Sequence, residues 1–231
     1  MTDNTHQLAT VKMKIEHAAQ QYHRASSDIT LLAVSKTKPA SAIADFYHAG
    51  QRAFGENYLQ EAREKQQKLA DLDIEWHFIG PIQSNKTKDI AEHFDWAHSV
   101  DRLKIATRLS QQRPSHLPPL NICIQVNIDE EPTKSGATLK ELPALVEAIS
   151  RLPQITLRGL MAIPAKKDDI TQQRAAFAKL AQANRDLATI TPLDTLSMGM
   201  SGDMEAAIAE GATIVRVGSA LFGARAAIIS R

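Results

Sequence analysis

Short apolar runs alternate with amphipathic segments along most of the chain. The runs, such as Leu31–Val34 and Leu120–Val126, have the length of a buried β-strand. Between the runs, apolar residues recur three or four positions apart, which is typical of helices that pack one face against a core. The pattern predicts eight strands, each followed by a helix, with the strands at residues 31–34, 52–54, 74–79, 95–100, 120–126, 155–163, 195–198 and 214–218.

A further amphipathic helix is expected before the first strand, because apolar residues recur at helical spacing from Leu8 to Tyr22. The helix expected from Tyr58 has two pairs of opposite charge four positions apart, Glu61 with Lys65 and Glu64 with Lys68, which support an exposed helical face. The clearest buried helical face is expected at residues 139–149.

Eight βα units in 231 residues fit a closed (β/α)8 barrel, the TIM barrel of the α/β class. A doubly wound open sheet is the alternative, since the sequence does not give the order of the strands. No change of composition typical of a linker interrupts the alternation. We therefore expect residues 1–231 to form a single barrel domain with an extra N-terminal helix.

The composition is that of an ordinary globular protein, with 43% hydrophobic and 23% charged residues. A net charge of +1 gives no bulk attraction for nucleic acid or an anionic membrane, and no apolar run reaches the ~18 residues of a membrane span. We therefore expect a cytoplasmic protein that binds neither nucleic acid nor a membrane. The single cysteine, Cys123, lies in an apolar run and is expected to be a buried hydrophobic residue.

Lys36 stands at the end of the first apolar run, where an amine is unusual. Pro39 disfavours helical geometry at Lys38, so the chain is expected to turn after Lys36 and to begin a helix near Ala40. One interpretation is a lysine that extends from a strand end into solvent. The other is an amine that forms a Schiff base with a carbonyl compound.

In a barrel of this type, functional groups gather where the strands end and the following loops begin. The residues at these positions are Lys36, Asn57, His77, Gly80, Asn127, Met161, the 197–201 segment and the 216–219 segment. Some have a purely structural interpretation, because His77 beside Trp76 fits a buried core histidine and Asn57 fits a helix cap. Together they are expected to form a ring.

The last two loops indicate an anion site. Residues 197–203 and 217–220 combine glycines with serine hydroxyls, and barrels often bind phosphate between the loops after strands seven and eight. A pair of ordinary capped turns is the alternative. Arg216 lies between Val215 and Val217 in an apolar strand, so its guanidinium needs a partner, which is either a carboxylate or a ligand atom.

An amine, a phosphate site and a buried arginine suggest a ligand that is both an aldehyde and a phosphate. Pyridoxal 5′-phosphate (PLP) meets both demands, with Lys36 as the amine and Arg216 facing the pyridine nitrogen. A charged arginine at that nitrogen disfavours its protonation, so PLP held in this way would be a weak electron sink.

Ordered motifs over nearly the whole chain resemble the pyridoxal phosphate homeostasis proteins. The motifs are Ala33-Val34-Ser35-Lys36, Phe54-Gly55-Glu56-Asn57-Tyr58, Trp76-His77-Phe78-Ile79-Gly80, Gln83-Ser84-Asn85-Lys86, Lys134-Ser135-Gly136, Arg158-Gly159-Leu160-Met161, Ser197-Met198-Gly199-Met200-Ser201 and Val215-Arg216-Val217-Gly218-Ser219. The sequence departs from the family pattern at Ser219, where threonine is frequent, and at Gly202, where an acidic residue or asparagine is common.

The resemblance implies a barrel like the N-terminal domain of alanine racemases, with PLP held as an aldimine on Lys36. It also implies that the protein buffers and delivers PLP, as part of vitamin B6 homeostasis, without an established catalytic reaction. The site residues implied by the resemblance are Ser201, Gly218 and Ser219 at the phosphate, Arg216 at the pyridine nitrogen, and Asn57, His77 and Met161 along the pocket. The expected partners are PLP and, transiently, apo PLP-dependent enzymes, with the chain itself a monomer.

Other functions remain open at this point. An amino-acid racemase of the same barrel type needs a tyrosine base from an additional domain of a partner subunit, and the tyrosines here are only Tyr22, Tyr47 and Tyr58 in a chain that ends at Arg231. A lyase that uses Lys36 directly on a phosphorylated keto substrate would be colourless, whereas a PLP protein is yellow. A protein-binding module is disfavoured, because no exposed apolar stripe is visible in the sequence.

Overall fold

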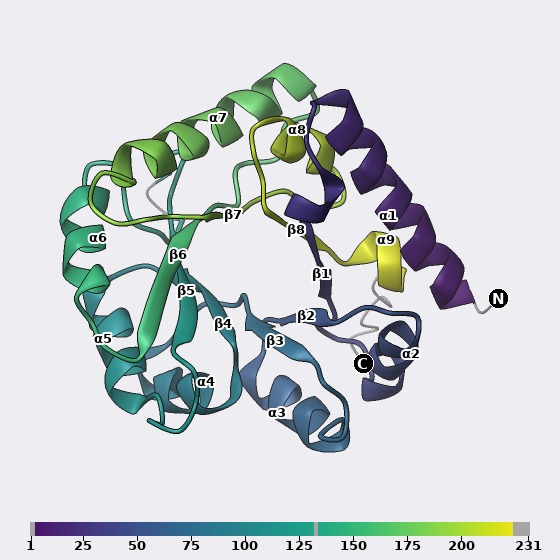
Figure 1. Ribbon diagram of the computed structural model, residues 1–231, viewed down its shortest axis with the longest axis horizontal. Helices are drawn as coiled ribbons and strands as arrows, with labels where there is room; N and C mark the ends of the chain where they lie inside the picture. The colour runs from purple at the N-terminus through teal and green to yellow at the C-terminus, as the bar shows by residue number, and fades with distance from the viewer. Residues whose placement is uncertain (1–2, 132–133, 224–231) are drawn as a thin grey trace, which may run out of the picture.

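The computed structural model describes residues 3–131 and 134–223. Eight parallel strands pair in the order of the sequence, and the last strand pairs with the first to close a barrel (Figure 1). The strands are β1 Thr30–Val34, β2 Ala53–Glu56, β3 Glu75–Phe78, β4 Trp96–Val100, β5 Leu120–Gln125, β6 Ile155–Met161, β7 Thr195–Ser197 and β8 Ile214–Val217. The closed order confirms the predicted TIM barrel and excludes the doubly wound open sheet.

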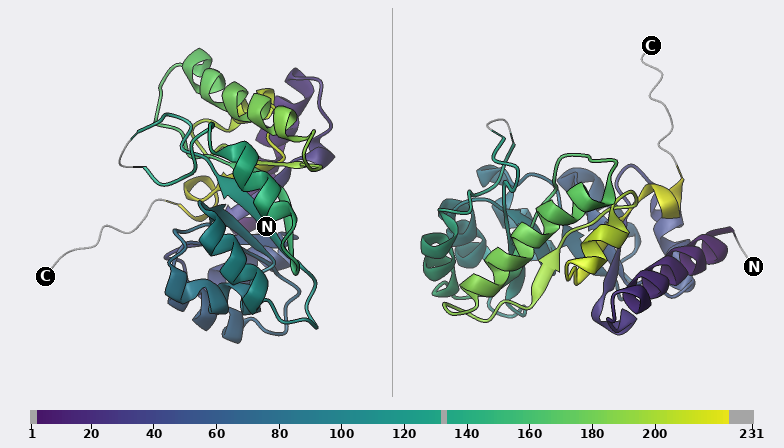
Figure 2. Two further views of the ribbon diagram at one scale, coloured as in Figure 1. Left: turned by 90° about the vertical axis from the view of Figure 1, so that its left-hand side faces the viewer. Right: turned by 90° about the horizontal axis from the view of Figure 1, so that it is seen from above.

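Helices follow the strands and form the outer layer of the barrel. They are α2 Ala40–His48, α3 Leu59–Lys68, α4 Thr87–His93, α5 Leu103–Gln112, α6 Leu142–Ser150, α7 Ile170–Leu187, α8 Met204–Ala209 and α9 Ser219–Phe222, with short 3-10 helices η1 Ser26–Asp28 and η2 Ser84–Lys86. The extra N-terminal helix is α1 Asp3–Gln21, which packs against α2, α8 and α9. Figure 2 shows α1 and α7 lying across the outside of the barrel.

The starts of two helices depend on local chemistry, and one of them differs from the face expected at residues 139–149. Leu139 lies ahead of α6, which begins at Leu142 with Pro143 in its first turn, where a proline is compatible with a helix. The helix α7 starts at Ile170, because the Asp169 side chain accepts a hydrogen bond from the Gln172 backbone N–H at 3.0 Å and caps it. Both helix starts are set by the residues at the helix end, a proline in one case and a capping aspartate in the other. The spacing of apolar residues does not predict such ends.

The barrel interior is filled by side chains rather than open. An inner cluster consists of Leu32, Ala53, Trp96, Cys123, Met161 and Ile214. Cys123 is fully buried in it, as expected, and burial raises the pKa of its thiol to about 12. Close packing also requires Gly159, since a Cβ there would lie 1.8 Å from the Thr195 carbonyl oxygen on β7.

Among the helices of the described residues, none is long and apolar enough to span a lipid bilayer.

Candidate functional site

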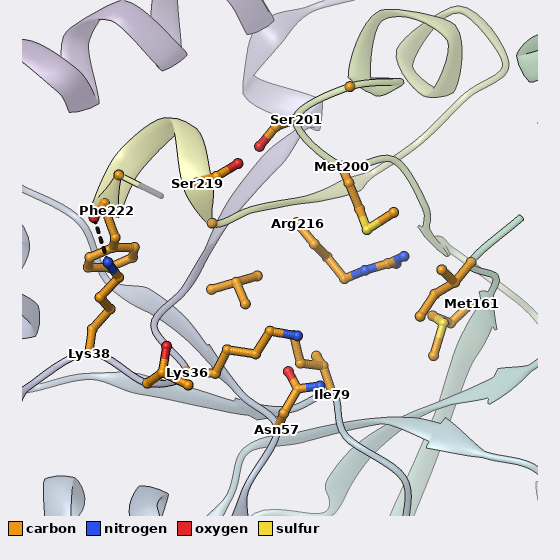
Figure 3. A pocket seen from close by; sticks show the side chains of 16 residues that line it. Lys36, Lys38, Asn57, Ile79, Met161, Met200, Ser201, Arg216, Ser219 and Phe222 are labelled. Carbon is orange, nitrogen blue, oxygen red and sulfur yellow. Dashed lines mark hydrogen bonds between the residues drawn. The ribbon is translucent and has the colours of Figure 1, made fainter. Parts of the chain in front are cut away.

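A cavity of about 340 Å³ opens at the end of the barrel where the strands finish. Its walls come from the residues that follow β1, β2, β3, β6, β7 and β8 (Figure 3). Seven of the eight residues expected to bind a cofactor line it: Lys36, Asn57, Met161, Ser201, Arg216, Gly218 and Ser219. The chain topology therefore brings together groups that are up to 183 positions apart in the sequence (219 − 36).

Lys36 lies in a turn between β1 and α2, two residues after the strand ends. The Lys38 backbone N–H donates to the Ser35 carbonyl oxygen at 3.0 Å and closes this turn. Thr37 has a φ of 65°, a left-handed conformation that is rare for a β-branched residue. Figure 3 shows the Lys36 side chain extending into the cavity, with its amine on the side of Asn57 and Ile79. The amine thus faces the cavity rather than open solvent.

A buried ion pair lies beneath this turn. Lys65 on α3 donates to Glu56 Oε1 at 2.7 Å and to the Ser35 carbonyl oxygen at 2.9 Å. The Ser35 hydroxyl donates to the same Glu56 oxygen at 2.6 Å. Burial raises the pKa of Glu56, and the Lys65 ammonium opposes that rise. The expectation of an exposed helical face holds for Glu64 and Lys68 but is wrong for Lys65, which is only 4% exposed.

Glu61 holds the other side of the turn. Its Oε1 accepts a hydrogen bond from the Thr37 backbone N–H at 2.6 Å and another from Lys65 at 2.5 Å. The residues on both sides of Lys36 are therefore fastened to one charged cluster on β2 and α3. This attachment holds Thr37 in its unfavourable conformation and fixes the backbone on both sides of Lys36.

Arg216 on β8 is 5% exposed and lies on the floor of the cavity. Its Nη1 donates to the Ser197 carbonyl oxygen at 2.6 Å and to the Ser197 hydroxyl at 2.8 Å, and its Nη2 donates to the Ala162 carbonyl oxygen at 2.9 Å. Burial lowers the pKa of Arg216 to about 10, so the guanidinium stays charged at neutral pH.

The partners of Arg216 within the described residues are two carbonyls and a hydroxyl, and none is a carboxylate. The sequence left the partner of this guanidinium open between a carboxylate and a ligand atom. In the structure, backbone carbonyl oxygens of β7 and of the segment after β6 are partners instead. A guanidinium carries five N–H groups, and the three bonds leave two of them for a molecule in the cavity.

Asn57, just after β2, contributes an acceptor to the cavity. Its Oδ1 is buried and has no hydrogen-bond partner among the described residues. A buried acceptor without a partner is costly in a folded protein, so its presence beside a cavity indicates a bound donor.

The loops after β7 and β8 form the opposite side of the cavity. Ser201 follows β7, and Gly218 and Ser219 stand at the start of α9. Figure 3 shows the hydroxyls of Ser201 and Ser219 at the same edge of the cavity, across from Lys36. The cavity therefore has an amine at one side and two hydroxyl donors at the other, as an aldehyde that also carries a phosphate requires.

His77 does not line the cavity. It is 1% exposed and lies in the barrel interior, hydrogen-bonded to His98 and Glu75. Residues two apart on a strand point the same way, and Ile79 therefore takes the place next to the cavity while His77 lies one layer below it. The position fits the alternative of a core histidine, although its partners are side chains rather than backbone.

Sequence reasoning missed the apolar side chains of the cavity. They are Val34, Ile79, Ile163, Met200 and Phe222. The Phe222 carbonyl oxygen also accepts a hydrogen bond from Lys38 Nζ at 2.7 Å, which joins the turn after β1 to the end of α9. Met200 and Ile163 are 40% and 44% exposed. In the sequence both stand at or just after the end of a predicted strand, and that position is the signal that could have identified them.

Known proteins resemble this chain over most of its length. The model of the alanine racemase N-terminal domain matches residues 12–226. The pyridoxal phosphate homeostasis protein of Pseudomonas aeruginosa is 61% identical over 218 residues, which cover 94% of each chain. The structure of PipY from Synechococcus elongatus with PLP bound has a TM-score of 0.80 at 41% identity, and the match covers 90% of this chain and 99% of that one.

A more distant structure shares the fold alone. An alanine racemase of Clostridium difficile has a TM-score of 0.68 at 15% identity. The match covers 94% of this chain and 57% of the racemase chain.

Proposed function

Because the chain belongs to the pyridoxal phosphate homeostasis proteins, which have the fold of the alanine racemase N-terminal domain, we propose that it binds PLP, stores it and delivers it to enzymes. The observation that carries the proposal is the composition of one cavity. An amine, a buried acceptor without a partner, a guanidinium with two N–H groups left and a pair of hydroxyls surround it. When bound, PLP supplies a reactive aldehyde, a phosphate and an aromatic ring nitrogen.

Each side chain of the cavity has a part in holding the cofactor. Lys36 would hold the cofactor covalently through its amine, at the aldehyde carbon. Arg216 donates an N–H to the ring nitrogen and, by its charge, keeps that nitrogen unprotonated. Asn57 Oδ1 accepts a hydrogen bond from the ring hydroxyl.

The remaining residues hold the phosphate and the ring. Ser201, Gly218 and Ser219 bind the phosphate through hydroxyl and backbone N–H donors. Met161 packs against the ring from the end of β6. His77 has no direct part, because it lies below the cavity.

We propose that the protein is a carrier rather than an enzyme, and that it works as a monomer in the cytoplasm. Homologues named for PLP homeostasis support the carrier role, whereas the shared fold with alanine racemase leaves a racemase as the rival. Apo PLP-dependent enzymes are the proposed recipients, because the amine of a recipient's lysine can replace Lys36 at the open end of the barrel.

Borohydride reduction followed by peptide mapping tests the assignment of Lys36. We expect the pyridoxyl group on Lys36, and we expect Lys36→Ala to lose both the adduct and the visible absorbance while keeping its circular dichroism. Lys38→Ala is the matched control, since Lys38 lines the same cavity but bonds to the Phe222 carbonyl oxygen. A main adduct on any other lysine would contradict the assignment.

A further inference from the structure

A chain of hydrogen bonds crosses the barrel interior from the cavity to its opposite end. Arg216 Nη1 contacts Ser197 Oγ at 2.8 Å, and Ser197 Oγ contacts His98 Nδ1 at 2.7 Å. His98 Nε2 contacts His77 Nδ1 at 2.9 Å, and His77 Nε2 contacts Glu75 Oε1 at 2.6 Å. Glu75 is the first residue of β3, at the end of the barrel opposite the cavity, and its side chain is 48% exposed. We call Glu75, His77, His98 and Ser197 the histidine relay.

When each histidine ring carries one hydrogen, the two ends of the histidine relay fix the direction of every bond in it. A guanidinium only donates, so the Ser197 oxygen accepts from Arg216, and the Ser197 hydroxyl hydrogen goes to His98 Nδ1. His98 then carries its hydrogen on Nε2 and donates to His77 Nδ1. His77 likewise carries its hydrogen on Nε2 and donates to Glu75, whose carboxylate only accepts. With one hydrogen on each ring, the two histidines thus share the same tautomer.

Burial keeps the middle of the histidine relay neutral. His98 is fully buried, and burial, His77 and Arg216 together hold its pKa well below its usual range. The ring of His77 stacks on Trp96, with ring centroids 5.4 Å apart and an angle of 5° between the planes. The charges that face this chain of bonds are Asp95 and Arg158 near its exposed end and Asp203 near Arg216. The buried thiol of Cys123 also lies near Arg216.

We propose that the histidine relay positions Arg216, so that its guanidinium faces the cavity with an N–H group available to the ring nitrogen of the cofactor. The proposal rests on the function proposed above. Neither histidine lines the cavity, so they act only through Ser197. A purely structural core histidine would be satisfied in either tautomer, whereas this arrangement allows only one for rings that carry a single hydrogen. The orientation of a group at the cofactor is thereby linked to a carboxylate at the opposite end of the barrel.

The tautomers can be measured without the cofactor. In the cofactor-free protein at pH 7, ¹⁵N NMR of labelled histidine should show His77 and His98 both neutral and both protonated on Nε2. Variants of each histidine assign the signals. A hydrogen on Nδ1 of either ring, or a doubly protonated ring, would overturn the proposed direction of the bonds. This result does not depend on whether the chain binds PLP.

Glu75→Gln tests the exposed end, where unfolding of the variant is not expected. An amide can donate as well as accept, so this variant loses the group that sets the direction. We expect a mixture of His77 tautomers in the free protein and a shift of the visible absorbance maximum after PLP is added. Glu147→Gln, at an exposed carboxylate on α6, should change neither. Parental tautomers and an unshifted spectrum in Glu75→Gln would refute the link.

Ser197→Ala tests the bond next to Arg216. The variant removes the hydroxyl but keeps the carbonyl that also holds the guanidinium. We expect PLP affinity to fall by about 3- to 10-fold, the usual effect of one buried hydrogen bond, together with an altered cofactor spectrum. Parental affinity with a parental spectrum would refute the positioning role. If the parent protein itself did not bind PLP, the proposed function would be refuted instead. The NMR result on the histidine tautomers would not be affected.

Discussion

Two serine hydroxyls lie at the side of the cavity that we propose for the phosphate, although they come from loops that follow different strands. We expect Ser201→Ala and Ser219→Ala each to weaken PLP binding by about 1 to 3 kcal/mol, the usual range for a hydrogen bond to a charged group. Fluorescence titration with PLP measures the loss. Pyridoxal, which has no phosphate, should bind equally to the parent and to both variants. Unchanged PLP affinity in both variants would place the anion site elsewhere.

His98 should make the stability of the fold depend on pH. Its pKa is depressed in the folded chain, whereas the unfolded chain takes up a proton near pH 6.5, the usual value for histidine. Stability is therefore fully present above pH 6.5 and is lost as the pH falls below it, by up to ~1.4 kcal/mol per pH unit from this one group.

Urea unfolding at pH 7.5, 6.5 and 5.5 measures this dependence. His98→Gln should be less stable at pH 7.5. Its free energy of unfolding should also fall less steeply with decreasing pH, because the contribution of His98 is gone. His116→Gln, at an exposed ring, should keep the parental slope. An unchanged slope in His98→Gln would mean that residue 98 takes up its proton equally in both states.

The turn that carries Lys36 depends on a charged cluster of two neighbouring elements. Lys65→Met would leave Glu56 buried without its cation, and breaking a buried pair in this way costs about 3 to 5 kcal/mol. We expect that loss in the free energy of unfolding, measured by urea titration. The same variant should react more slowly with PLP, because Thr37 and Lys36 lose their anchor.

Lys68→Met on the same helix is the matched control. Lys68 is exposed, so its removal should change the free energy of unfolding by less than about 0.5 kcal/mol. Equal stability of the two variants would show that the cluster does not hold the turn.

The elements were largely predictable because each one buries a continuous apolar run or stripe. The order of strands and helices, the N-terminal helix and the closed barrel all follow from that pattern. The buried role of Lys65 did not follow, since its partner four residues away suggested a surface pair, whereas Glu56 belongs to another element. The spacing of residues along one helix predicts neighbours on that helix. It does not predict a contact with a carboxylate on another element, such as Glu56 on β2.

The candidate site was predictable wherever a strand end and a chemical group coincide, as at Lys36 and Arg216. His77 shows the limit of this reasoning. A strand period gives the direction of a side chain but not its depth, and one layer of depth separates His77 from the cavity. The histidine relay was likewise not predictable, because its residues meet through the relative placement of β3, β4 and β7, which the sequence pattern does not give.

The molecule as a whole should transfer its cofactor without acting on amino acids. At the position that we propose for it, the charged Arg216 would disfavour protonation of the ring nitrogen, and no tyrosine is found among the described residues that line the cavity. We expect the PLP-loaded protein to reactivate an apo PLP enzyme while leaving L-alanine unracemised over hours. Chiral chromatography and the activity of the acceptor enzyme measure the two outcomes. Racemisation that disappears in Lys36→Ala would establish the racemase instead, and failure of both reactions would leave storage alone.

The reactivity of Cys123 can serve as a measure of how often the barrel opens. The chain has one thiol, it is fully buried in the barrel, and its pKa of about 12 leaves almost no thiolate at neutral pH. An alkylating reagent can therefore react only in molecules whose barrel has opened, and each event adds a single mass increment. Any molecule that binds only the closed barrel slows this labelling by a factor of 1 + [L]/Kd. Vitamin B6 compounds and their analogues could thus be ranked by mass spectrometry, with no need for a coloured or covalently attached ligand.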